Sequence, residues 1–179
     1  MGWIAGSAWG LAALLAAGAG WAEEDCGDGC EPGRVELGSY GGGGWHAATV
    51  AHEDGDISCM VYARAGDAAP ERGLWLHVYP SHLRFTPEQP LDGQEFINIS
   101  AGDMTMPMAV SRGVGFVPLT FPMFARAVGS ASTLTLHLGV RRPIDAQEFF
   151  TWSMDGFRDA FSRIAAECAF DPAPLLGED

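Results

Sequence analysis

The fold is decided by one stretch near the C-terminus, Phe149–Cys168, which reads FFTWSMDGFRDAFSRIAAEC. From Asp155 onward its apolar residues recur every three or four positions, which is the period of one face of an α-helix. This apolar face comprises Phe157, Ala160, Phe161, Ile164, Ala165 and Cys168. Charged and polar residues occupy the opposite face, and Ser153 or Asp155 is placed to cap the N-terminus. The stretch therefore predicts an amphipathic helix over about 155–168.

Short strands are expected upstream of this helix. Thr133–Val140 alternates most clearly, with leucine or valine at every second position, and Ile57–Arg64 also alternates. Leu74–Tyr79 is apolar on both faces, as a central strand would be, and His82–Phe85 is expected to continue it beyond Pro80. Further strands are expected at Trp45–Val50, Phe96–Ile99, Met104–Val110 and Gly115–Leu119, before a stretch of small residues at Phe124–Ala131.

Many short strands followed by one closing helix predict a mainly β fold, a β-sandwich or open barrel covered by one C-terminal α-helix. We expect the β-rich globular domain to span residues 45–170. Residues 23–44 are acidic and Gly-rich without apolar periodicity, so they are expected to form a flexible arm. Residues 171–179 are acidic and Pro-rich, and a disordered tail is expected there.

The N-terminus has the features of a secretory signal peptide. Ile4–Ala17 is apolar or small but too short to span a bilayer, and Gly20-Trp21-Ala22 has the small-x-small pattern of a cleavage site. We therefore expect residues 1–22 to be removed and the protein to be periplasmic or secreted, with no stable membrane insertion after cleavage. A retained membrane anchor is the alternative.

The charge balance excludes one class of partner. The 179 residues include 23 Asp and Glu and 10 basic residues, all of them arginine, which gives a net charge of −13 at pH 7. An acidic protein repels phosphate backbones and anionic lipid surfaces. No nucleic-acid partner is therefore expected.

The cysteine count favours disulfides. An even number of cysteines is typical of disulfide-bonded exported proteins, and the four here, Cys26, Cys30, Cys59 and Cys168, allow three pairings. Cys59 lies on the apolar face of its expected strand, and Cys168 extends the apolar face of the helix. Both are expected to point into the layer between sheet and helix. We predict a bridge between Cys59 and Cys168, which leaves Cys26 and Cys30 to pair locally.

A methionine pattern raises the question of a metal site. Met104, Met106 and Met108 recur at every second position, so a strand would place three thioethers on one face. Soft sulfur ligands select Cu(I). Residues able to complete such a site are Met123, His77, His82 and His137. Methionine is also an adaptable core residue, and no histidine lies at a diagnostic spacing, so we expect core filling and keep the three methionines as weak metal candidates.

The sequence contains no recognisable catalytic motif. It lacks a G-x-S-x-G elbow, a P-loop, an HExxH pair and a dinucleotide-binding fingerprint, and no carboxylate pair stands out. We therefore assign no catalytic residues and no cofactor. A hydrolase without a recognisable motif is the least favoured function, after an accessory domain and a binder of a small ligand or metal.

Two parts of the chain carry a resemblance. Trp45 lies fourteen residues before Cys59, and Ser153–Phe161 reads SMDGFRDAF. Together they resemble the invasion-associated locus B family of exported bacterial proteins, whose closing segment has the pattern S-L-x-G-F-x-x-A. The similarity would cover about residues 45–168. It implies a periplasmic or secreted β-rich accessory protein without known catalytic residues, and it supplies no site residues.

The sequence thus favours a non-enzymatic exported accessory domain that acts through contacts with an envelope or extracellular protein. The alternative is a periplasmic protein that binds a small ligand or a metal such as copper. A pocket lined by Met and His would favour the binder, and a buried carboxylate or Ser/His pair would favour an enzyme. A flat surface with exposed aromatic residues would favour the interaction domain.

Overall fold

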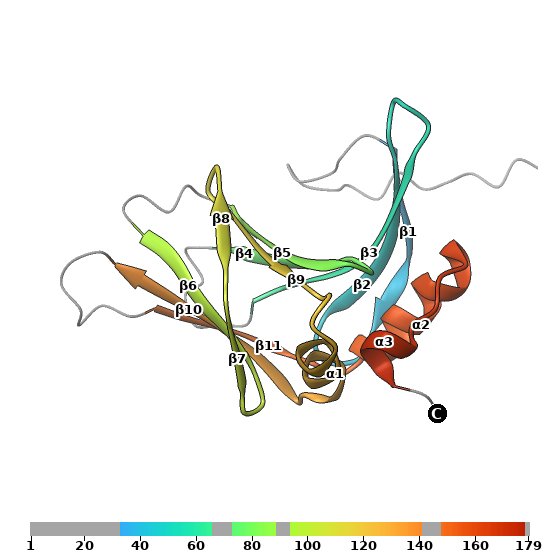
Figure 1. Cartoon of the computed structure of the whole chain (residues 1–179). Helices are drawn as coiled ribbons and strands as arrows, with labels where there is room; N and C mark the ends of the chain where they lie inside the picture. Colours follow the sequence, from blue (N-terminus) through green and yellow to red (C-terminus); the bar gives the residue numbers. More distant parts are fainter. Residues whose placement is uncertain (1–32, 66–72, 89–93, 141–147, 178–179) are drawn as a thin grey trace, which may run out of the picture. The chain divides into compact units, whose positions relative to one another are not determined.

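Two antiparallel sheets make up most of the structure, a computed structural model that describes residues 33–65, 73–88, 94–140 and 148–177 (Figure 1). The seven-stranded sheet has the order β1-β2-β3-β4-β5-β9-β8, and the four-stranded sheet has the order β11-β10-β6-β7. The strands of the first sheet are β1 (Arg34–Tyr40), β2 (Trp45–Ala51), β3 (Ile57–Arg64), β4 (Leu74–Val78), β5 (His82–Pro87), β8 (Ala109–Ser111) and β9 (Val114–Pro118). Those of the second are β6 (Gln94–Ala101), β7 (Met104–Pro107), β10 (Thr133–Val140) and β11 (Glu148–Ser153). The helices are α1 (Pro122–Ser130), α2 (Phe157–Cys168) and α3 (Ala173–Leu176).

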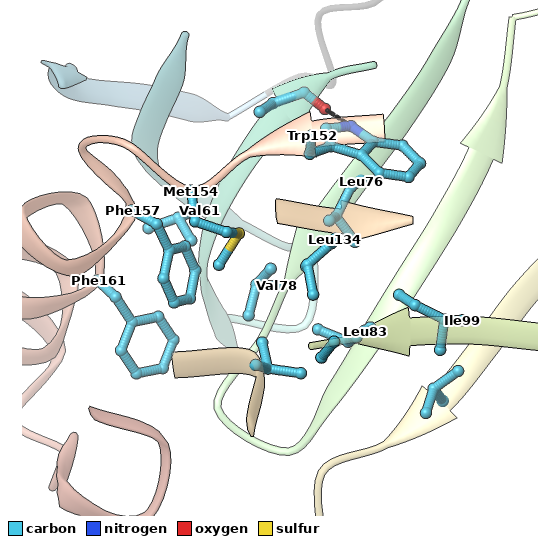
Figure 2. Packing of buried hydrophobic residues seen from close by; sticks show 14 of the residues in the cluster. Val61, Leu76, Val78, Leu83, Ile99, Leu134, Trp152, Met154, Phe157 and Phe161 are labelled. Atoms are coloured by element: carbon cyan, nitrogen blue, oxygen red, sulfur yellow. Dashed lines mark hydrogen bonds between the residues drawn. The ribbon is translucent and has the colours of Figure 1, made fainter. Parts of the chain in front are cut away.

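The predicted class, mainly β with a closing C-terminal helix, is confirmed, and the described strands form two separate sheets rather than a closed barrel. Alternation along the strands builds one main core from both sheets. Leu134, Leu136 and Leu138 of β10 are buried, as their spacing predicts. Trp152 of β11 donates a hydrogen bond of 3.1 Å to the Ala63 carbonyl of β3, and this bond links the two sheets (Figure 2).

Helix α2 docks through the face that the sequence predicts. Phe157, Phe161 and Ile164 are at most 1% exposed, and Figure 2 shows both phenylalanine rings directed into the core. The helix packs against β1, β2 and β3. A disulfide joins Cys59 of β3 to Cys168 at the end of α2, with 6.4 Å between the Cα atoms, so the predicted bridge is confirmed. The expected Cys26–Cys30 pair and the signal peptide lie outside the described residues.

The start of α2 differs from the prediction, because neither Ser153 nor Asp155 caps it with a side-chain hydrogen bond. Gly156 occupies the cap position with a left-handed φ of 84°. A Cβ atom there would lie 2.3 Å from the Tyr40 carbonyl oxygen, so this close approach requires glycine. The Asp155 carboxylate instead accepts a hydrogen bond of 2.6 Å from the Gly42 amide. The helix therefore begins at Phe157 rather than at 155.

The predicted flexible arm over 23–44 is wrong for its second half. Arg34–Tyr40 forms edge strand β1, which pairs with β2 through a register interrupted between Glu36 and Gly38. The globular domain therefore includes β1 and does not begin at Trp45. Residues 23–32 lie outside the described part of the chain.

Two strand predictions were wrong at prolines. The segment His82–Pro87 does not continue β4 beyond Pro80 but reverses to pair with it as β5, with Val78 opposite Leu83. The expected strand Met104–Val110 is divided after Pro107, which has no amide hydrogen to extend a ladder, and Met108 lies in neither strand. β7 belongs to the four-stranded sheet and β8 to the seven-stranded sheet.

The C-terminal half contains elements that the sequence did not indicate. The small-residue stretch at 124–131 forms helix α1, which starts with Pro122 and buries Phe124, Ala125 and Val128. The predicted disordered tail, 171–179, contains α3, whose Leu175 and Leu176 are buried. α3 packs against α1. None of the described helices is both long and apolar enough to cross a membrane.

Candidate functional site

The most distinctive surface is the side of the seven-stranded sheet that faces away from the main core, here called the outer face. Register pairing places five residues in one row across β2, β3, β4, β5 and β9. In order, they are His46, Tyr62, His77, Arg84 and Phe116. Directly opposed residues in antiparallel strands share a face, so these rings and the guanidinium lie side by side. A small cluster of Ala48, Val50, Met60 and Tyr62 supports the row.

One end of the row is fixed by an ion pair and a tyrosine. Arg34 and Glu36 of β1 form an ion pair with 2.6 Å between Arg34 Nε and Glu36 Oε1. The Tyr62 hydroxyl donates to the same oxygen at 2.6 Å, and the Arg34 guanidinium carbon lies 3.9 Å from the centre of the Tyr62 ring. Burial, together with the bond to Glu36, raises the pKa of Tyr62. Tyr62 is therefore a fixed hydrogen-bond donor and not a titrating group at neutral pH.

Aromatic rings surround the other end. Tyr79 stacks on His82 with 4.6 Å between ring centres, and His82 lies 6.0 Å from Phe116. These rings are half-buried rather than fully enclosed. On the neighbouring register, the Trp75 ring nitrogen donates to Glu88 at 2.8 Å. Flat rings that keep part of their surface accessible are typical of recognition surfaces.

Three polar atoms at the centre of the outer face are buried without a hydrogen-bond partner. They are Nδ1 of His77, Nε of Arg84 and Oγ1 of Thr86. His77 and Arg84 are register partners, and Thr86 follows two residues after Arg84 on the same face. Each unpaired buried group costs roughly 1–3 kcal/mol, and native proteins contain few of them. These three neighbouring atoms make the centre of the outer face the candidate position for a polar group of another molecule.

The electrostatics of this centre keep its histidines neutral. Burial lowers the pKa of His77 to about 4, and the nearby charges of Arg84 and Arg34 add to the effect. Burial and Arg84 also lower the pKa of His82. The arginines therefore supply the positive charge of the outer face at neutral pH.

The lowered pKa of His77 predicts a loss of stability in mild acid. Between its ordinary pKa of 6.5 and about 4, the unfolded chain binds a proton that folded His77 does not bind, so stability falls as the pH falls. From pH 7 to pH 5 the contribution of His77 amounts to about 2 kcal/mol. Urea denaturation at both pH values should show a loss smaller by about that amount in His77→Gln than in the wild type. Equal losses in the two proteins would contradict the assignment.

The three methionines at alternate positions lie beside the main core. Met104, Met106 and Met108 are partly buried and pack against it. Of the residues proposed to complete a copper site, His77 and His82 lie on the outer face. Met123 is 76% exposed on α1, the helix that packs against β7.

His137 also lies away from the methionines. On β10 it contacts Ser100 at 3.3 Å and the Phe149 ring, while the neighbouring residues Leu136 and Leu138 point into the core. Within the described residues, no group of three or more His, Cys, Asp or Glu side chains is placed to hold a metal ion.

Three serine–histidine pairs lie within hydrogen-bond distance. His52 is 2.7 Å from Ser58 at an exposed hairpin, His82 is 3.0 Å from Ser81, and His137 is 3.3 Å from Ser100. A nucleophilic serine needs a histidine that a third group orients. In the described part of the chain, no carboxylate bonds to any of these three histidines, so none of the pairs has the arrangement of a hydrolase.

Sequence reasoning missed the residues of the outer face. His77 and Arg84 are seven positions apart, and they become neighbours because the chain turns at Pro80-Ser81 between β4 and β5. Reading Pro80 as a hairpin turn, rather than as an interruption of one strand, would have paired His77 with Arg84. In the sequence, His77 and His82 were considered only as possible metal ligands, and no residue that they contact on a neighbouring strand could be identified.

Comparison of the chain with family models, curated proteins and solved structures gave no match. The function is therefore inferred from the fold and from the outer face.

Proposed function

We propose that this protein is a non-enzymatic exported module that binds an envelope or extracellular protein through the outer face. The observation that carries the proposal is the row from His46 to Phe116, with unpaired polar atoms at its centre. Strands lie about 4.7 Å apart, so a row over five strands is roughly 19 Å long. Tyrosine, tryptophan and arginine are the residues that most often dominate protein–protein binding energy. A row that spans five strands and includes a tyrosine and an arginine suits a protein surface better than an enclosed small molecule.

The other two functions receive less support. A copper-binding role relied on the methionine pattern, and those thioethers pack against the core. A hydrolase role would need an oriented serine–histidine pair, and the three described pairs lack an orienting carboxylate.

The resemblance to the invasion-associated locus B family is compatible with an exported accessory role but points to no site. Its two parts meet in the structure, where the Trp45 ring nitrogen donates to the Ser153 carbonyl at 2.8 Å. The Trp45 ring also lies 4.8 Å from that of Phe157. These contacts fasten α2 to the first strands, so the shared pattern has a structural reason whatever the partner.

Site-specific photo-crosslinking tests the proposal. Benzoyl-phenylalanine in place of Tyr79 keeps an aromatic ring at this position and puts the reactive benzoyl group on the outer face. On irradiation of the source cells, we expect discrete adducts with an envelope or extracellular protein. The matched control is the same substitution at Phe149, which is 46% exposed on the four-stranded sheet. The proposal fails if both positions give the same adducts, or if only Phe149 gives them.

A further inference from the structure

We propose that His77, Arg84 and Thr86 form a carboxylate-binding subsite, which receives an Asp, Glu or C-terminal carboxylate from an acidic segment of the partner. This inference rests on the proposed function, because it names the chemical group that the outer face recognises.

The hydrogen-bonding groups of the three residues favour a ligand that accepts hydrogen bonds. The Arg84 Nε–H group can only donate, the Thr86 hydroxyl can donate, and neutral His77 donates from Nδ1 in one of its two tautomers. All three atoms are buried and unpaired. A carboxylate accepts up to four hydrogen bonds and is the common protein group that satisfies several donors at once.

The charge of the outer face favours a negatively charged ligand. Arg34 is paired with Glu36, and Arg64 with Glu88, so these four residues contribute no net charge to the outer face. Among the described residues, Arg84 has neither an ion pair nor a hydrogen bond to balance it. The face thus carries one uncompensated positive charge on a protein whose net charge is −13. One negative group from a partner complements it, and arginine suits a carboxylate because its planar donors match the two oxygens.

The rings around the subsite offer a ligand a route to the buried donors. The subsite is bordered by Tyr79, His82 and Phe116, whose rings contact one another at the surface. Rotamer changes of such interface rings are common on binding, and they would open a path to the buried donors. The same rings would then pack on the segment that carries the carboxylate.

Proton uptake should accompany binding. A carboxylate beside His77 offsets the effects of burial and of the arginines that hold its pKa near 4, so the bound state favours the protonated ring. Other titratable or charged groups on this face are Arg34, Glu36, His46, Tyr62, Arg64, His82, Arg84 and Glu88. Of these, His82 also has a lowered pKa and is expected to respond in the same direction. Affinity for an acidic segment should therefore rise as the pH falls from 7.0 to 5.5.

The test uses fluorescein-labelled hexaglutamate as the probe, with hexaglutamine as its neutral counterpart, in anisotropy titrations of the full chain at pH 7.0 and at pH 5.5. We expect the wild type to bind hexaglutamate and not hexaglutamine, more tightly at pH 5.5. Arg84→Gln should weaken binding by about 10- to 100-fold, as loss of a charged hydrogen bond does. Arg126→Gln, an exposed arginine on α1, is the matched control and should bind like the wild type.

Further variants keep the result interpretable if Arg84→Gln folds poorly. Thr86→Val preserves the shape of the side chain and should weaken binding by several fold, and His77→Gln should reduce the gain in affinity at pH 5.5. Equal binding by Arg84→Gln and Arg126→Gln, or binding of hexaglutamine as well as hexaglutamate, would overturn the subsite. Free glutarate binding as tightly as hexaglutamate would overturn the protein-segment part in favour of a small acid.

The crosslinking experiment separates this inference from the proposed function. If benzoyl-phenylalanine at position 79 crosslinks a partner in cells and hexaglutamate fails to bind, the protein-binding role of the outer face is supported. The proposal of a carboxylate subsite is then wrong. If hexaglutamate binds with the expected dependence on Arg84 and Tyr79 gives no adduct, the subsite stands and the proposed protein-binding role fails.

Discussion

Replacing Phe161 by alanine is expected to lower the free energy of unfolding by about 3–5 kcal/mol. The side chain is 1% exposed, and its ring lies 5.6 Å from that of Phe157 and 5.4 Å from that of Phe170. Truncation removes these contacts and leaves a cavity under α2 that the neighbouring rings fill only in part. A typical domain is stable by roughly 5–15 kcal/mol, so this loss is a large share of the total. Urea denaturation followed by circular dichroism measures it.

The matched control is Arg163→Ala, two positions away on the opposite face of the same helix. Arg163 is exposed and pairs with Glu167 at 3.1 Å, and exposed pairs one helical turn apart contribute little. Its replacement should change the free energy of unfolding by no more than about 0.5 kcal/mol. Equal losses from the two substitutions would mean that the buried face of α2 is assigned wrongly.

The sequence predicted those features whose signal is local. The apolar face of α2 and the inward residues of β10 depend only on periods of 3.6 and 2 residues, which can be read from consecutive positions. The Cys59–Cys168 bridge followed from the same two patterns, because each cysteine continued an apolar face. Its confirmation shows that both faces had been assigned correctly.

Other elements were missed because their stability comes from contacts and not from pattern. Arg34–Tyr40 is mostly polar, yet it becomes β1 through backbone pairing with β2 and the contacts of Arg34 and Glu36 with Tyr62. Helix α1 has only 9 residues and α3 only 4. Helices this short are marginal alone and form here because each buries apolar residues. Such tertiary effects leave little trace in a short window of sequence.

The candidate site was hidden for a related reason. Alternation indicates which residues share a face within one strand, but not which strands lie side by side. His46, Tyr62 and His77 become neighbours only once β2, β3 and β4 are paired in a known register. The lowered pKa of His77 likewise follows from burial and from Arg84 on the adjacent strand. The chemistry of the outer face is therefore a product of the sheet and not of any single motif.

Removing the confirmed bridge should produce the other large effect. The variant Cys59→Ala/Cys168→Ala is expected to lose about 4–5 kcal/mol, because the bridge joins residues 109 positions apart and so restricts most of the unfolded chain. Both cysteines are only partly buried, so the truncation itself contributes little. Because the unfolded chain becomes more expanded without the bridge, the denaturant dependence of stability should also steepen. Urea denaturation under non-reducing conditions measures both quantities.

The variant Cys26→Ala/Cys30→Ala is the matched control, since a local bridge there would enclose only three residues. Loop-closure entropy grows with the length of the closed loop, so its removal should cost far less than that of the long bridge. Non-reducing peptide mapping of the wild type supplies the independent check and should recover a peptide that joins Cys59 to Cys168. A peptide joining Cys26 or Cys30 to Cys168 would contradict the pairing, and equal losses in the two double variants would contradict the stabilising role given to the long bridge.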